Sequence, residues 1–189
     1  MDADFSIELG HDDPVLDFPW TDPSAQVAYY DVKRHPELMA KVDEALKFPE
    51  LAAFLRSVNS TRSGFESAKC DAWATSELTA EEDIFAAAYK FSSYVDLVCS
   101  NVEQRRSFDF HEGFARELTD LLRRAPEMLV SVEVCVRRCF FAETQPVLEG
   151  FYFTIYVNGY GGDEPAAQTN WAIGLQLAAN AILQLSAGR

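Results

Sequence analysis

Ionisable and aromatic residues that could form a binding or catalytic site occur together in alternating stretches of this sequence. They are Asp71, Trp73, Tyr94, Asp96, Glu133, Arg137 and Tyr156. Carboxylates that lay close together would raise one another's pKa, which gives the protonated and ionised pair that general acid–base catalysis needs. The arginine could then hold an anionic group through two parallel hydrogen bonds. The rings could form the walls of a pocket for a small molecule.

Three interpretations explain why rings and charges occur together, and the sequence leaves all of them open. In the first, the N-terminal segment folds over these residues and closes a second small core, and the charged residues form structural ion pairs. In the second, the residues form a self-complementary homodimer interface. In the third, they line a pocket for a small ligand. These arrangements can coexist, so enzymatic activity stays undecided and the expected partner is a small molecule or a second copy of the chain.

Other candidate motifs fail on geometry or spacing. Cys135 and Cys139 would lie about 13 Å apart along a strand, at about 3.3 Å per residue, which is too far for thiolates that share one zinc ion. None of the three histidines belongs to a paired metal-ligand pattern. The glycine-rich residues 159–162 precede a helix, as phosphate loops do, but Asp163 places negative charge where the phosphate would bind. We therefore predict a turn there, no metal site and no cofactor.

The candidate residues require a sheet that presents them on one face. Residues 66–77, 90–99, 129–142 and 150–160 alternate apolar with polar side chains, which predicts strands. The apolar side chains of these strands are expected to face helices. The opposite face then carries Lys69, Asp71, Trp73, Tyr94, Asp96, Glu133, Cys135, Arg137, Tyr152, Thr154, Tyr156 and Asn158. An ordinary solvated sheet face has fewer rings, so we expect something to cover this one.

Two long amphipathic helices are expected to cover the apolar side of the sheet. Apolar residues recur at helical spacing from Asp109 to Pro126, and again from the N-cap residue Asp163 to residue 185. The order strand, strand, helix thus occurs twice within residues 66–187, which suggests an internal duplication. The predicted fold class is α+β, a two-layer sandwich in which both helices cover one face of a mainly antiparallel sheet.

The N-terminal part, residues 1–62, is predicted to add a strand, a loop and short helices to this core. Residues 5–9 alternate like a strand, and the Asp- and Pro-rich residues 11–23 predict a surface loop. The anchors of that loop are Leu16, Phe18 and Trp20. Apolar spacing after Pro36 and Pro49 predicts helices at 36–47 and 49–58. A chain of 189 residues, 1–189, is expected to form a single domain.

Composition argues against several classes of partner. A net charge of -14 and a pI of about 4.5 repel phosphate backbones and anionic lipids, so we expect neither nucleic acid nor a membrane as a partner. The first residues lack the basic and apolar regions of a signal peptide, and no apolar run approaches the roughly 20 residues of a membrane span. The four cysteines are too few for a disulfide scaffold, which favours a cytoplasmic protein with reduced thiols.

Overall fold

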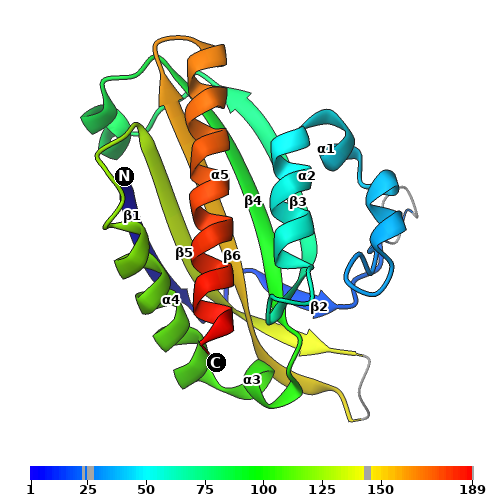
Figure 1. Cartoon of the computed structure of the whole chain (residues 1–189). Helices are drawn as coiled ribbons and strands as arrows, with labels where there is room; N and C mark the ends of the chain where they lie inside the picture. Colours follow the sequence, from blue (N-terminus) through cyan, green and yellow to red (C-terminus); the bar gives the residue numbers. More distant parts are fainter. Residues whose placement is uncertain (23, 25–27, 143–145, 189) are drawn as a thin grey trace.

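The computed structural model describes residues 1–22, 24, 28–142 and 146–188, and these form a sheet of six strands covered by helices (Figure 1). The strands are β1 (Asp2–Glu8), β2 (Val15–Phe18), β3 (Phe65–Thr75), β4 (Tyr89–Cys99), β5 (Val130–Phe141) and β6 (Leu148–Gly161). The helices are η1 (Pro36–Lys41), α1 (Asp43–Lys47), α2 (Pro49–Val58), η2 (Ala80–Phe85), α3 (Val102–Arg106), α4 (Phe108–Leu122) and α5 (Glu164–Ala187). The predicted α+β class is therefore confirmed.

Two antiparallel strand pairs make up most of the sheet. The pairs β3–β4 and β5–β6 are antiparallel, and an antiparallel pairing of β4 with β6 joins them. The strand order is β1-β5-β6-β4-β3, which leaves β1 and β3 at the edges. Both β1 and β2 pair with β5 in parallel, one after the other along its length. The internal duplication and the single domain stay predictions.

One apolar core lies between the sheet and the helices on one of its faces. Helices α4 and α5 lie across this face, and α2 lies beside α5 (Figure 1). Trp171 of α5, Phe114 of α4 and Leu55 of α2 are buried there with Phe153 and Val132 of the sheet. Helix α2 therefore joins the two helices that the sequence predicts on this face. The first interpretation requires the N-terminal segment to fold over the opposite face, but the short helices of that segment do not lie there.

The turn predicted at residues 159–162 is wrong, because β6 continues to Gly161. A Cβ atom at Gly159 would lie 2.1 Å from the backbone nitrogen of Trp171 and 2.3 Å from the carbonyl oxygen of Ala167. Glycine at this position lets the backbone of α5 cross β6 in direct contact. The glycine-rich segment therefore reflects helix–strand packing.

The loop predicted at residues 11–23 is partly wrong. Residues 15–18 form β2, which pairs with β5, and both Leu16 and Phe18 are buried as the anchors were expected to be. The alternation of apolar and polar residues therefore predicts the structure of residues 15–18 better than the surrounding prolines do. Pro23, at the end of this predicted loop, lies outside the described residues.

Two predicted helices differ in their bounds. The helix expected at 36–47 is divided into η1 and α1, because Val42 between them has extended backbone angles, φ -89° and ψ 105°. Helix α4 begins at Phe108, because Ser107 caps it instead of Asp109: the Ser107 hydroxyl accepts a hydrogen bond from the Phe110 N–H at 3.1 Å. Asp163 caps α5 as predicted, accepting from the Ala166 N–H at 2.8 Å.

Candidate functional site

The candidate residues share the helix-free face, which is the face of the sheet opposite α2, α4 and α5. Asp71 of β3 pairs with Tyr94 of β4, which pairs in turn with Tyr156 of β6. The ring centroids of Trp73 and Tyr94 lie 6.4 Å apart, and those of Tyr94 and Tyr156 lie 6.1 Å apart. Arg137 completes the row, with its guanidinium carbon 5.6 Å from the Tyr156 centroid. The residues thus form a continuous row across four strands.

The chain itself covers both ends of the helix-free face. At one end, Phe18 of β2 packs with Phe141 and Tyr152 in a second small core. At the other end, Phe85 of η2 stacks on Tyr160 with the ring centroids 4.0 Å apart. The expectation of a second core closed by the N-terminal segment is therefore right for one end, whereas the middle of the face keeps its rings accessible. Trp73, for example, is 39% exposed.

A chain of hydrogen bonds runs beneath the ring row. The Thr154 hydroxyl donates to Asp96 Oδ1 at 2.7 Å and accepts from Arg137 Nη1 at 2.9 Å. Arg137 Nε donates to Glu8 Oε2 at 2.7 Å, and the Arg137 Nη2 atom lies at the same distance from that oxygen. The guanidinium is therefore already paired with a carboxylate of its own chain, and the predicted role in binding an anionic ligand gives way to a structural ion pair.

Burial raises the pKa of Asp96 to about 6, while its bond from Thr154 and the positive charges of Lys69 and Arg137 lower it. Asp96 is only 5% exposed. The predicted cause, repulsion within a cluster of carboxylates, is therefore wrong, because loss of hydration dominates. Glu133, the third predicted carboxylate, is exposed and lies opposite Tyr156 in the pairing of β5 with β6.

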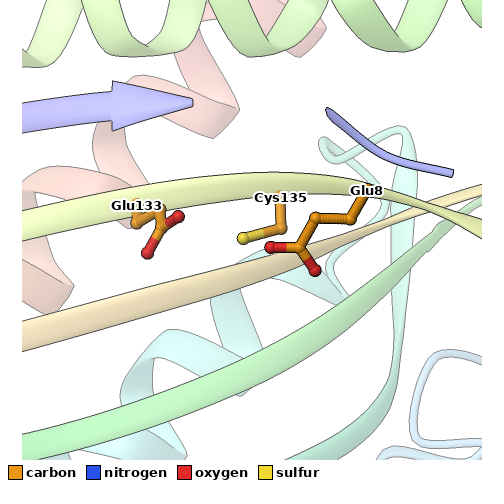
Figure 2. Close-up of side chains that lie close together, drawn as sticks. All are labelled: Glu8, Glu133 and Cys135. Atoms are coloured by element: carbon orange, nitrogen blue, oxygen red, sulfur yellow. The ribbon is translucent and has the colours of Figure 1, made fainter. Parts of the chain in front are cut away.

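Glu8, Glu133 and Cys135 bring their ligand atoms within 4.8 Å of one another (Figure 2). The sequence does not reveal this group, because Glu8 reaches the other two only through the parallel pairing of β1 with β5. The group is poorly suited to a metal ion. Arg137 already neutralises Glu8, and burial raises the pKa of the Cys135 thiol to about 12 while the Ser6 hydroxyl donates to its sulfur. A metal ion would therefore have to displace the thiol proton and compete with Arg137 for Glu8.

A cavity of about 590 Å³ lies along the outer edge of β3, and we call it the β3-edge cavity. Its charged lining residues are Lys41, Asp43, Glu44, Lys69 and Asp71, and its aromatic ones are Trp20, Tyr30 and Tyr94. Five consecutive residues of β3, 67–71, form one wall. A volume of about 300–1,000 Å³ with apolar walls and a few polar groups is typical of small-molecule sites.

The charges in the β3-edge cavity are not equally engaged. The Lys69 ammonium lies 5.2 Å from the Trp20 ring centroid, and that of Lys41 lies 5.9 Å from the Tyr30 centroid, so both lysines contact aromatic rings. The carboxylates of Asp43, Glu44 and Asp71 form no ion pair within the described part of the chain. The lining therefore carries three carboxylates against two ammonium groups, a small excess of negative charge beside aromatic walls.

The titratable groups near the cavity favour binding over catalysis. Burial raises the pKa of the Cys70 thiol to about 12, and the nearby carboxylates of Glu44, Asp71 and Asp96 add to the shift. Burial followed by the charges of Asp96 and Asp71 likewise raises the pKa of Tyr94 to about 12. Both groups keep their protons near neutral pH, so neither acts as a nucleophile or base.

The cavity gathers only part of the predicted set. Asp71 and Tyr94 line it, Trp73 contacts Tyr94, and Asp96 lies buried nearby. The other predicted residues, Glu133, Arg137 and Tyr156, do not line it. Sequence reasoning missed Tyr30, Lys41, Asp43 and Glu44, which come from the irregular and short helical N-terminal segments and carry no periodic signal towards β3.

A larger hollow of about 760 Å³ lies between α2 and α5 on the outer side of the helices. Glu50 is the one charged residue among those that line it, and its other lining groups are neutral. The hollow therefore offers hydrogen-bonding side chains but a single charged one and only one aromatic ring, that of Phe54, and the smaller β3-edge cavity, with more charges and rings, is the better candidate.

Comparison with models of protein families, with curated proteins and with solved structures found no match for this chain. Within the residues that the structure describes, none of the helices combines the length and the apolar composition that crossing a membrane requires. A function for this chain therefore rests on the chemistry of the β3-edge cavity.

Proposed function

We propose that this chain is a binding module that holds a small, positively charged ligand in the β3-edge cavity. The observation that carries this proposal is that Asp43, Glu44 and Asp71, which form no ion pair among the described residues, line the same cavity as the rings of Trp20 and Tyr94. A cationic group gains from nearby carboxylates and from the faces of aromatic rings. The net charge of the whole chain, -14, would draw cations towards the cavity as well.

Binding without chemistry is the better proposal for this site. The thiol and phenol at the cavity stay protonated near neutral pH, because burial raises the pKa of Cys70 and of Tyr94 to about 12. Asp96, with a pKa of about 6, has the value of a general acid or base, but it is buried against Thr154 and does not line the cavity. An acid–base enzyme would need a group with such a pKa that reaches its substrate.

A homodimer is the second candidate, and the exposed Trp73 favours it. Trp73 is 39% exposed beside Tyr94 on the helix-free face, and Tyr94 in turn contacts Tyr156. Exposed aromatic rings in a row are typical of the centre of a protein interface. Tyr94 and Tyr156 also pair across β4 and β6, so the proposed duplication would make them equivalent positions of two ββα units. A cytoplasmic location accompanies both candidates as a proposal from composition.

Thermal unfolding in the presence of putrescine, lysine amide, free amino acids and dicarboxylates tests the proposed function. A ligand at a hundred times its Kd stabilises the folded state by about 2.7 kcal/mol, which raises the Tm of a chain of this size by about 5–10 °C. We expect amines to raise the Tm and dicarboxylates to leave it unchanged.

Matched variants locate the effect. The double variant Glu44→Gln with Asp71→Asn should lose the amine response, whereas Glu149→Gln, at an exposed carboxylate of β6, should keep it. Equal responses in the two variants, or none in the unmodified chain, would refute the proposal. Light scattering of the same samples tests the second candidate: a dimer that Trp73→Ala dissociates would favour the interface.

A further inference from the structure

The outer edge of β3 is satisfied by side chains where a neighbouring strand would otherwise pair. Trp20 Nε1 donates a hydrogen bond to the carbonyl oxygen of Ala68 at 2.7 Å. Lys33 Nζ donates to the carbonyl oxygen of Phe65 at the same distance. These two side chains attach the N-terminal segment to β3 without a ladder of backbone hydrogen bonds, so they satisfy only the groups that they reach.

Beyond Ala68, the outward backbone groups of β3 face the β3-edge cavity. Residues of an edge strand point their N–H and C=O alternately towards the neighbouring strand and towards the open side. The Ala68 carbonyl points to the open side, and so does the Ala72 N–H, which bonds to the carboxylate of Asp71 at 2.7 Å. Cys70 lies between them with the same orientation, and it lines the cavity. The described chain supplies no hydrogen bond to its outward N–H and C=O.

The cavity has the length of a short extended segment. Its β3 wall runs from Ser67 to Asp71, which is about 13 Å at about 3.3 Å per residue. An extended peptide that lay beside this wall could exchange two backbone hydrogen bonds with Cys70. Addition of a strand to an open sheet edge is a general mode of peptide recognition.

The charges of the cavity select the peptide. Lys41 and Lys69 already contact aromatic rings, whereas the carboxylates of Asp43, Glu44 and Asp71 have no ion-pair partner among the described residues. A lysine or arginine side chain of the bound segment would supply that partner. A segment rich in acidic residues would meet like charge in the cavity and across a chain with a net charge of -14.

From these observations we propose that the ligand of the β3-edge cavity is a basic, extended peptide segment, which adds to the outer edge of β3 by pairing its backbone with Cys70. This inference rests on the proposed function and gives its ligand a chemical class. The hydrogen bonds hold the segment extended beside β3, and the carboxylates select its side chains.

Fluorescence polarisation with synthetic hexapeptides tests the inference. One labelled peptide alternates lysine with valine and the other alternates glutamate with valine, and both have blocked ends so that only side chains carry charge. We expect the lysine peptide to bind at least about tenfold more tightly than the glutamate peptide, since each 1.4 kcal/mol corresponds to a factor of about ten. Methylation of the lysine peptide's backbone nitrogens should weaken its binding by about tenfold, because it removes the donors.

Two proline variants on the same edge provide the matched comparison. Cys70→Pro removes the outward N–H at the cavity, and Ala74→Pro removes the equivalent outward N–H farther along β3, outside the cavity. Proline is tolerated on edge strands where the N–H faces away from the neighbouring strand. Binding of the lysine peptide should fall about tenfold in the first variant and stay within about twofold in the second.

Equal binding of the two peptides, equal binding by the two proline variants or no effect of backbone methylation would each overturn the inference. The amine panel then separates the two proposals. If amines still raise the Tm of the unmodified chain and the double variant of Glu44 and Asp71 abolishes that effect, the cavity binds a small cation and the peptide inference alone is wrong. If the amines also fail, both are wrong.

Discussion

Replacing Asp96 by asparagine should stabilise the protein at neutral pH but not at acidic pH. Burial raises the pKa of Asp96 from 3.8 to about 6 in the folded state. Below about pH 3.8 both the folded and the unfolded chain keep the proton, so the shift has no cost. Between that value and about pH 6 the unfolded chain ionises first, which lowers the free energy of unfolding as the pH rises. The difference of about 2.2 pKa units corresponds to about 3 kcal/mol at 1.36 kcal/mol per unit.

Urea denaturation at a series of pH values from 3.5 to 8 measures this effect. The free energy of unfolding of Asp96→Asn should exceed that of the unmodified chain by an amount that is smallest at about pH 3.5, grows through about pH 6 and is then constant. The control is Asp12→Asn, whose side chain is fully exposed. It should show no such growth. A variant that is destabilised at pH 7 would show that attraction to Lys69 and Arg137 outweighs the loss of hydration. A difference independent of pH would show that the two cancel, and either result would contradict the prediction.

Two further predictions concern packing and use the same urea assay. Gly159→Ala places a Cβ 2.1 Å from the backbone of Trp171, so it should lower the free energy of unfolding by at least about 3 kcal/mol. The control Gly113→Ala in α4 meets nothing within 4 Å and should raise that free energy by about 0.5–1 kcal/mol. Similar effects at the two positions would contradict the close crossing of α5 and β6. Arg105→Ala removes the guanidinium that lies 2.8 Å from the buried Glu66 carboxylate, so it should lower the free energy of unfolding by about 3–5 kcal/mol. Adding Glu66→Gln should recover part of that loss. A loss under about 1 kcal/mol would mean that water replaces the guanidinium.

Alternation of side chains predicted the functional face of the sheet better than it predicted the site. The strands at 66–77, 90–99, 129–142 and 150–160 match β3 to β6 within a few residues. Side-chain direction in a strand has a period of two, so the helix-free face with Trp73, Tyr94 and Tyr156 followed from the sequence. Periodicity says nothing about how far such a face is covered, and the second small core and η2 cover both of its ends.

The environment of each charged group could not be predicted, because it depends on contacts between distant segments. Arg137 is paired with Glu8, which lies 129 residues away in the sequence and meets it through the parallel pairing of β1 with β5. Asp96 owes its raised pKa to burial rather than to another carboxylate. Long-range pairing and burial are consequences of the whole fold, whereas local periodicity fixes only the elements.

The position of the β3-edge cavity follows from the path of the N-terminal segment. Tyr29 packs against Phe18 on the helix-free face, and Val42 packs against the core on the opposite face, so the intervening residues pass around the outer edge of β3. The side chains of Lys33 and Trp20 hold this segment at Phe65 and Ala68, and no backbone hydrogen bond among the described residues joins it to β3. Between these contacts and Ala72, the outward backbone of Cys70 has no hydrogen-bond partner from the described chain. A backbone edge without a hydrogen-bond partner from the described chain, in a cavity that carboxylates line, can pair with both the backbone and the basic side chains of a peptide, which is why we place the ligand there.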